Sequence, residues 1–269
     1  MKTSDGLQNY PPQATGEIQR AIRFKRRARW FNQHWLDVIL TLFLLFNLGP
    51  WFAPVFMKFG WTTPATVTYT LYSPLCHQMA QRSFFLFGED VMYAPEAFPF
   101  ALSGNTGEDT RRLRQFRGNE ELGWKVAWSD RMISMYSGLW LAMLLFAILS
   151  RFRRIRPLPL WVFVLTLLPM LLDGGTHMIS DFDGLQAGFR YDNVWLASLT
   201  GHALPDGFYL GDDLGSFNSW MRLLSGVVFG FGVIWFVFPY LLQAVEQASL
   251  TLQVQLNRAA EFYDLTEEK

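Results

Sequence analysis

The apolar residues of the chain are concentrated in four long blocks rather than spread evenly. These blocks cover residues 35–57, 132–149, 158–177 and 223–242. Each approaches or exceeds about 18 apolar residues, the length at which a helix can cross a bilayer core about 30 Å thick. The pattern therefore predicts an all-α integral membrane protein with about four transmembrane helices and long extracytoplasmic loops.

The third block ends in polar residues. Its strictly apolar run, residues 158–172, covers only about 23 Å at about 1.5 Å per residue, so the helix must continue to cross the bilayer. A continued helix places Asp173 and His177 four residues apart on one face. Such groups are costly at membrane depth unless they are paired, so they mark a candidate site. The alternative is that Gly174 and Gly175 end the helix and both side chains are hydrated.

Basic residues predict how the helices are oriented. Six lysines and arginines lie within residues 16–34, before the first block, and four arginines lie within 151–156, after the second. Short basic segments stay in the cytoplasm, which predicts that both termini are inside. The loop 180–217 is expected outside, since its six aspartates are accompanied by a single arginine, Arg190.

These features divide the chain into three parts. Residues 1–34 are interpreted as a basic cytoplasmic tail with a surface helix, 35–242 as the transmembrane domain, and 243–269 as a polar cytoplasmic C-terminal tail. The basic surface helix at 16–34 is expected to bind anionic lipid rather than nucleic acid, because it directly precedes a span.

Two stretches of the long loop after the first span allow a structural prediction. Residues 63–88 are rich in Tyr, Leu, Phe and Met but contain Pro64 and Pro74, which favours an interfacial or re-entrant helix. Residues 104–117 contain two glycines and mixed charges and are expected to form a loop.

Composition narrows the possible chemistry. Cys76 is the only cysteine, which excludes a disulfide within the chain and a cysteine-rich zinc or iron–sulfur site. The first fifteen residues have no hydrophobic core, so we expect an uncleaved first span rather than a cleaved secretory signal. Motifs of metalloproteases, α/β-hydrolases, phosphate-binding loops and attached haem are absent from the sequence.

Four motifs within residues 71–230 resemble a family of predicted membrane proteins, domain of unknown function 2085 (DUF2085). The matching residues are Cys76-His77-Gln78, Arg82-Ser83-Phe84 and Gly88; Arg131, Tyr136 and Gly138; Pro169 and Asp173-Gly174-Gly175-Thr176; and Asn218, Arg222 and Gly226. Ser129 and Met132 replace two cysteines of the family pattern, and His177 replaces a glutamine. Typical members look like carriers of a soft-metal or redox site. Here the resemblance implies either that this site is lost or that its ligands have shifted.

The candidate site is expected on the extracytoplasmic side. Its residues are Cys76, His77, Gln78, Arg82, Arg131, Asp173, His177 and Arg222. Asp173 and Arg222 fall at the same depth, which predicts a salt bridge, although Arg222 reaching lipid headgroups is an equal alternative. A shifted metal site would use Cys76, His77 and His177, with Asp173 as a further ligand; haem is the other candidate cofactor.

Three functions remain open. The preferred one is a non-catalytic scaffold or subunit of a membrane complex, with a membrane protein partner or a second copy bound by helix faces such as that of Gly226 and Gly230. The alternative is a membrane enzyme or a metal- or haem-binding redox protein with its site near Cys76, His77, Asp173 and His177. A small transporter is a second alternative. The expected location is the prokaryotic cell (inner) membrane.

Overall fold

The computed structural model describes residues 11–263 and contains four helices long and apolar enough to cross a membrane. These are α1 (Pro12–Lys58), α4 (Asp130–Ser150), α5 (Leu160–Asp181) and α9 (Phe217–Phe262). The predicted helical membrane protein with four spans is confirmed. The first ten residues of the expected N-terminal tail and the last six of the C-terminal tail lie outside the described residues.

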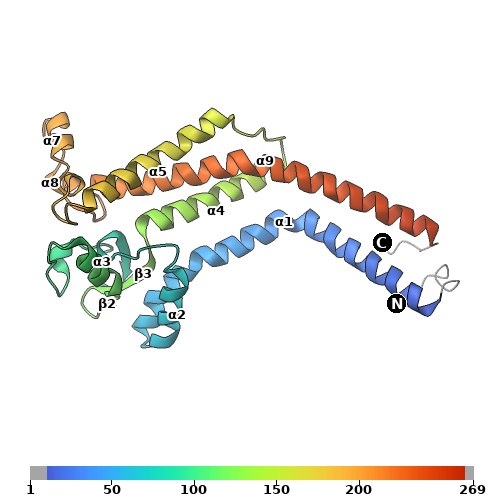
Figure 1. Ribbon diagram of the computed structural model, residues 1–269, viewed down its shortest axis with the longest axis horizontal. Coiled ribbons are helices and arrows are strands. Elements are labelled where there is room, and N and C mark those ends of the chain that lie inside the picture. The colour runs from blue at the N-terminus through green and yellow to red at the C-terminus, as the bar shows by residue number, and fades with distance from the viewer. Residues whose placement is uncertain (1–10, 264–269) are drawn as a thin grey trace.

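Helices α1 and α9 are much longer than a membrane crossing. The basic stretch 16–34 is the first part of α1, and residues 243–262 are the last part of α9, so each predicted tail helix is continuous with a span. Helix α4 lies between α1 and α9, while α5 runs along the other side of α9 (Figure 1). The N-terminal end of α1 and the C-terminal end of α9 lie at the same end of the molecule (Figure 1).

Helix α5 is the least buried of the four. In its most apolar stretch of 18 residues only 11% are buried, and large side chains such as Trp161, Leu171 and Leu172 are more than 60% exposed. A helix with so much apolar surface requires an apolar surrounding. The exposed surface of α5 thus agrees with a chain embedded in lipid.

Glycines let α4 and α9 approach closely. A Cβ at Gly226 would overlap the Ser134 hydroxyl, and one at Gly230 would lie 2.5 Å from the backbone nitrogen of Leu139. The small-residue pair predicted to permit helix packing therefore lies at the α4–α9 interface. Farther along α9 from Gly230, the side chains of Trp35, Phe146 and Phe238 belong to one buried cluster that joins α1, α4 and α9.

The loops at the far end form a folded cap, defined here as residues 59–129 and 182–216 (Figure 1). Its first part contains α2 (Thr62–Tyr72), η2 (Ala80–Arg82), β1 (Ser83–Leu86), η3 (Pro95–Ala97), α3 (Thr106–Gln115), β2 (Gly118–Asn119) and β3 (Gly123–Ser129). Its second part contains α6 (Phe189–Asp192), α7 (Val194–Thr200) and α8 (Asp206–Tyr209). The strands form an antiparallel sheet in the order β1-β3-β2.

One local prediction for the cap was wrong in its extent and another was wrong in kind. The helix expected over residues 63–88 ends at Tyr72, because the chain turns after Pro74 and then enters η2 and β1. The loop expected over 104–117 is largely helix α3, whose start is capped by the Asn105 side chain accepting a hydrogen bond from the Glu108 amide at 3.1 Å. The small sheet was not predicted.

Strand β3 connects the cap to the membrane helices. Val126, Ala127 and Trp128 are at most 1% exposed, and the strand runs directly into α4 at Asp130. Trp128 stacks on Tyr136 of α4 with ring centroids 4.6 Å apart. The cap core therefore fixes the start of α4 and the residues around it.

Replacing Gly230 with alanine should destabilise the protein by about 1–3 kcal/mol, because the new methyl group meets the rigid backbone of α4. The matched control is Gly175→Ala in α5, where no atom lies within 4 Å and alanine should stabilise the helix by about 0.5–1 kcal/mol. Thermal unfolding of both variants in detergent measures the difference. A Gly230→Ala protein as stable as the wild type would contradict close α4–α9 packing.

Candidate functional site

The polar end of α5 is buried while the flanking residues are exposed. Helix α5 continues through Gly174 and Gly175 to Asp181, so the alternative that these glycines end it is wrong. Asp173, His177 and Ser180 are at most 3% exposed, whereas Leu172 and Met178 are each 62% exposed. The predicted shared face of Asp173 and His177 therefore exists, and it points into the protein.

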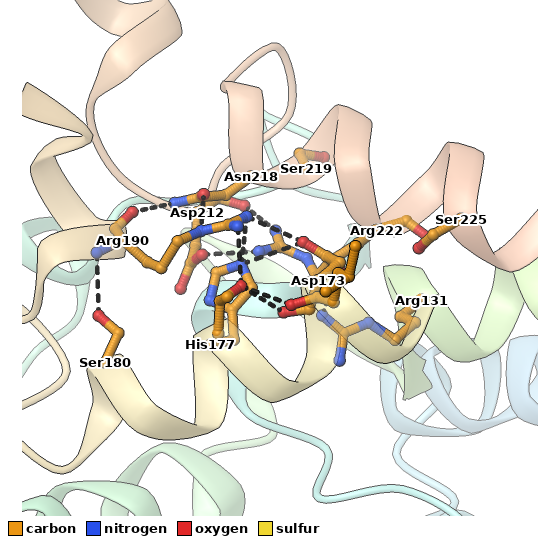
Figure 2. Close-up of polar contacts among 12 residues, drawn as sticks. Arg131, Asp173, His177, Ser180, Arg190, Asp212, Asn218, Ser219, Arg222 and Ser225 are labelled. Carbon is orange, nitrogen blue, oxygen red and sulfur yellow. Dashed lines mark hydrogen bonds and ion pairs between the residues drawn. The ribbon is translucent and has the colours of Figure 1, made fainter. Parts of the chain in front are cut away.

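Around this face lies a charge network of four arginines and four aspartates. Figure 2 shows Arg131, Arg190, Arg222, Asp173 and Asp212 of this network. Asp173 binds Arg131 at 2.6 Å and Arg190 at 2.8 Å. Asp212 binds Arg82 at 2.7 Å and Arg222 at 2.6 Å. Arg222 also binds Asp130 at 2.8 Å, and Arg82 also binds Asp181 at 2.9 Å. The four positive and four negative charges balance.

The prediction of a salt bridge between Asp173 and Arg222 was wrong, because each residue binds other partners. Arg222 points to Asp130 and Asp212, while Asp173 is held by Arg131 and Arg190. The alternative, with Arg222 reaching lipid headgroups, is also wrong because the side chain is 2% exposed. Both residues belong to one network, but through different ion pairs.

Four members of the network were missed by sequence reasoning: Asp130, Asp181, Arg190 and Asp212. Arg190 had a usable signal, since it is the single basic residue in a loop with six aspartates. Asp130 is adjacent to Arg131, which was already a candidate. Nothing local distinguishes Asp181 or Asp212 from the other aspartates of loop 180–217, and their shared partner Arg82 lies 99 and 130 residues away in the chain.

The environment fixes the charges of the network members in the cap. Burial alone would raise the pKa of Asp212, but the guanidinium groups of Arg82 and Arg222 lower it well below its usual range. Burial alone would lower the pKa of Arg82, but Asp212 and Asp181 raise it above its ordinary value. Both side chains are therefore ionised at any physiological pH.

Six of the eight candidate residues line a cavity of about 290 Å³. They are Cys76, His77, Gln78, Arg82, Arg131 and Arg222, joined by Leu75, Met79, Ser129 and Met132. Asp173 and His177 are not in its wall, although Asp173 binds the wall residue Arg131. The structure thus assembles most of the candidate site around one space, with the charge network behind it.

Cys76 is held by the backbone at the cavity wall. The amides of Gln78 and Ser129 each donate a hydrogen bond to its sulfur at 3.3 Å, and its thiol donates to the Ser129 hydroxyl at 3.4 Å. Gln78 adopts a left-handed conformation with φ 54°, and its side chain donates to the carbonyl of Tyr69. These bonds define the turn that carries Cys76 and His77.

The predicted metal ligands are not assembled. Within residues 11–263 no group of three or more His, Cys, Asp or Glu side chains is placed to hold a metal ion. His77 is exposed, while His177 is buried with its Nε2 3.2 Å from Arg190 and 3.7 Å from Asp173. The surroundings of His177 are therefore those of a network member.

Lys125 on β3 is a buried cation beneath the cavity turn. Its ammonium donates to the carbonyls of Gln78 at 2.6 Å, Arg114 at 2.8 Å and Leu113 at 3.1 Å. Burial lowers the pKa of Lys125 to about 7, and the arginines nearby act in the same direction. Lys125 thereby ties the cavity turn to the C-terminal end of α3, where cations are favoured.

Comparison with known proteins identifies the family pattern in the second half of the chain. Residues 121–236 match the family model described as "Predicted membrane protein (DUF2085)". The resemblance to DUF2085 is confirmed. The chain is also 23% identical over 213 residues to the uncharacterized protein MJ1492 of Methanocaldococcus jannaschii, an alignment that covers 77% of this chain and 93% of the relative. No solved structure matches the chain.

The DUF2085 motif around Asn218 serves the network directly. Its side-chain amide donates to the carbonyls of Arg190 and Gly211, and its side-chain oxygen accepts from Arg190 at 3.2 Å. Arg222, one helical turn later, forms ion pairs with Asp130 and Asp212. Gly226 lacks a side chain and so lets α4 pack closely against α9. The three spaced motif residues thus fix the loop between α5 and α9, balance charge and allow helix packing.

The departures from the family pattern lie at the cavity. Ser129 and Met132, which replace two cysteines, are both in its wall, and Ser129 contacts the remaining Cys76. The first motif, with Cys76 and His77, lies outside the matched residues 121–236 but forms the same wall. The replacements therefore concern one site rather than scattered positions.

Substituting Asp212 with asparagine should destabilise the protein by about 3–5 kcal/mol, since it removes one carboxylate from two buried guanidinium groups. Asp37→Asn is the control, because Asp37 and its partner Arg151 are 3.8 Å apart and largely exposed, and its effect should stay within about 0.5 kcal/mol. Unfolding in detergent measures both. Equal stability of the two variants would refute the structural role of the network.

The buried ammonium of Lys125 predicts a pH-dependent stability. Because its pKa is lowered to about 7 in the folded protein, the unfolded chain binds the extra proton above that pH, and stability should rise between pH 7 and about 10. Lys125→Met lacks this effect and leaves three carbonyls without a donor, at a cost of about 1–3 kcal/mol. The stability gap between wild type and variant should widen as pH rises; a constant gap would contradict the assignment.

Proposed function

We propose that the protein is a non-catalytic integral membrane scaffold, or a subunit of a membrane complex. The observation that carries the proposal is that all four carboxylates of the charge network are held by guanidinium groups at 2.6–2.9 Å. A general base needs a carboxylate within hydrogen-bond reach of the substrate, whereas these carboxylates face guanidinium groups of the protein itself. These ion pairs act instead to hold segments of the protein together, and we call the four arginines and four aspartates of the charge network the clamp.

The clamp joins segments that are far apart in the chain. Asp130 and Arg131 begin α4, Asp173 and Asp181 lie in the second half of α5, and Arg222 lies in the second turn of α9. The cap supplies the remaining members, Arg82, Arg190 and Asp212. Separating one partner of such a buried pair from the other is strongly destabilising. The paired side chains therefore hold the joined segments as one rigid unit. A rigid outer end is what a docking platform in a membrane complex requires.

An apolar surface on the cap supports a protein partner. On the short helix α7, Val194 is 58% exposed, Trp195 47% and Leu199 77%. Exposed apolar side chains grouped on one element favour a contact with another protein. We infer that α7 contributes to this contact, with a different membrane protein or a second copy as the partner.

The orientation is part of the proposal. The connection between α4 and α5, which contains the arginines at 151–156, lies at the ends of these helices away from the cap, and the basic part of α1 also lies on that side (Figure 1). This arrangement supports a cytoplasmic location for both termini. Basic residues next to a span attract anionic lipid headgroups. We infer that the basic segment 16–34 contacts anionic lipid on that side.

A membrane enzyme is the second candidate, and one observation favours it. The sulfur of Cys76 accepts two backbone amides and lies in the cavity wall beside three arginines. Amide donors and cationic groups stabilise a thiolate, which is the reactive form of cysteine. A reactive Cys76 would make the cavity a catalytic site.

The two candidates differ in what single substitutions do to a cell that depends on this protein. A scaffold should keep its function with Cys76→Ser, and its complex in mildly solubilised membranes should keep its native mass. Leu199→Asp should reduce that mass to the free chain, whereas Ser198→Asp, an exposed neighbour with the same added charge, should not. A folded Cys76→Ser protein without function would overturn the scaffold and support the enzyme.

A further inference from the structure

The cavity wall is rich in hydrogen-bond donors and contains no carboxylate. Arg82, Arg131 and Arg222 contribute guanidinium groups, and Ser129 and His77 contribute further polar groups. The aspartates that bind these arginines are absent from the wall and lie behind it. A ligand in this space therefore meets N–H and O–H groups, which is the environment that an oxyanion prefers.

Arg131 has donor groups that the protein does not use. Its Nη2 binds Asp173 at 2.6 Å, but among the described residues its buried Nε has no hydrogen-bond partner. A buried donor without a partner costs about 1–3 kcal/mol, so a ligand that accepts from it gains binding energy. The Nε and Nη groups of an arginine match two oxygens of a phosphate group in a forked contact.

Arg82 and Arg222 are fixed before any ligand arrives. Each is held by two aspartates, yet a guanidinium has five N–H groups and these contacts use only part of them. Their positions are therefore preorganised, which lowers the cost of binding. Gly174 leaves space for the third arginine, since a Cβ there would lie 3.3 Å from the Arg131 Nη1.

The charge balance near the cavity also favours an anion. The four arginines and four aspartates of the network cancel, whereas Lys125 is bound to three carbonyls and to no carboxylate of the described residues. One of those carbonyls belongs to Gln78, a wall residue. When Lys125 is protonated, the region therefore carries one positive charge that nothing in it balances.

The location and size of the cavity indicate which kind of anion it binds. The wall residues Arg131 and Arg222 lie in the first turn of α4 and the second turn of α9, at the cap-side ends of two membrane-spanning helices, where headgroups are expected. Leu75, Met79 and Met132 add an apolar side to the wall, and Leu75 is 43% exposed. A volume of about 290 Å³ accommodates a headgroup rather than a whole lipid.

We propose that this cavity binds a phosphate ester group, with Arg131 as the principal contact. The group is that of an anionic lipid headgroup or of a small soluble phosphate, and both sources share the same recognition chemistry. The apolar side of the wall and its depth favour the lipid. The bound anion would lie beside the charge network. This proposal holds whether the protein is a scaffold or an enzyme.

The test uses the purified full-length protein in detergent after its lipids have been exchanged. The probes are short-chain phosphatidic acid, short-chain phosphatidylcholine and inorganic phosphate, and binding is followed by native mass spectrometry and thermal shift. Phosphatidic acid should bind at least about tenfold more tightly than phosphatidylcholine. Competition by inorganic phosphate at equal concentration would assign the source to a soluble phosphate, and its failure to compete would assign it to the lipid.

Two variants place the binding in the cavity. Arg131→Gln should weaken phosphatidic acid binding by about tenfold or more, with Arg153→Gln at the opposite end as the control. Because Arg131→Gln also frees Asp173, His77→Glu provides a second variant: it is exposed, should fold normally, and adds a carboxylate to the wall. Its control is Gln243→Glu, an exposed residue on α9. Binding unchanged in His77→Glu, or equal for both lipids, would overturn the proposal.

Discussion

The pairing of buried charge at one end of the helices is the constraint on which the rest of this structure depends. Four aspartates and four arginines lie largely out of water, where an unpaired ion costs several kcal/mol. No single helix supplies a complete set. Helices α4, α5 and α9 and the cap are therefore held in one arrangement, because any other arrangement leaves a charge without its partner.

Helix α5 illustrates this dependence. Most of its surface is apolar and exposed, so contact with lipid can satisfy it in many positions. Two features remove that freedom. The side chain of Thr166 packs directly against Gly232 of α9, and Asp173 binds one arginine from α4 and one from the loop that follows α5. Lipid thus explains why α5 is a helix in the membrane, and the charge network explains where it lies.

The sequence predicted those features that depend on short spacing. The four spans follow from the lengths of apolar blocks, and the shared face of Asp173 and His177 follows from a separation of four residues. The partners of Asp173 could not be predicted, since Arg131 is 42 positions away and helix ends offer several arginines at similar depth. Strands of two to seven residues and the ten-residue helix α3 were missed because such short elements show no clear period.

The position of Arg222 late in the chain has a consequence for biogenesis. Asp130 is synthesised 92 residues before the guanidinium that neutralises it, and Asp212 also precedes it. Arg131, Asp173 and Arg190 can meet as soon as the third span has been inserted. Asp130 acquires its partner only when the fourth span enters, so the last helix completes a half-assembled protein and fixes its cap-side end.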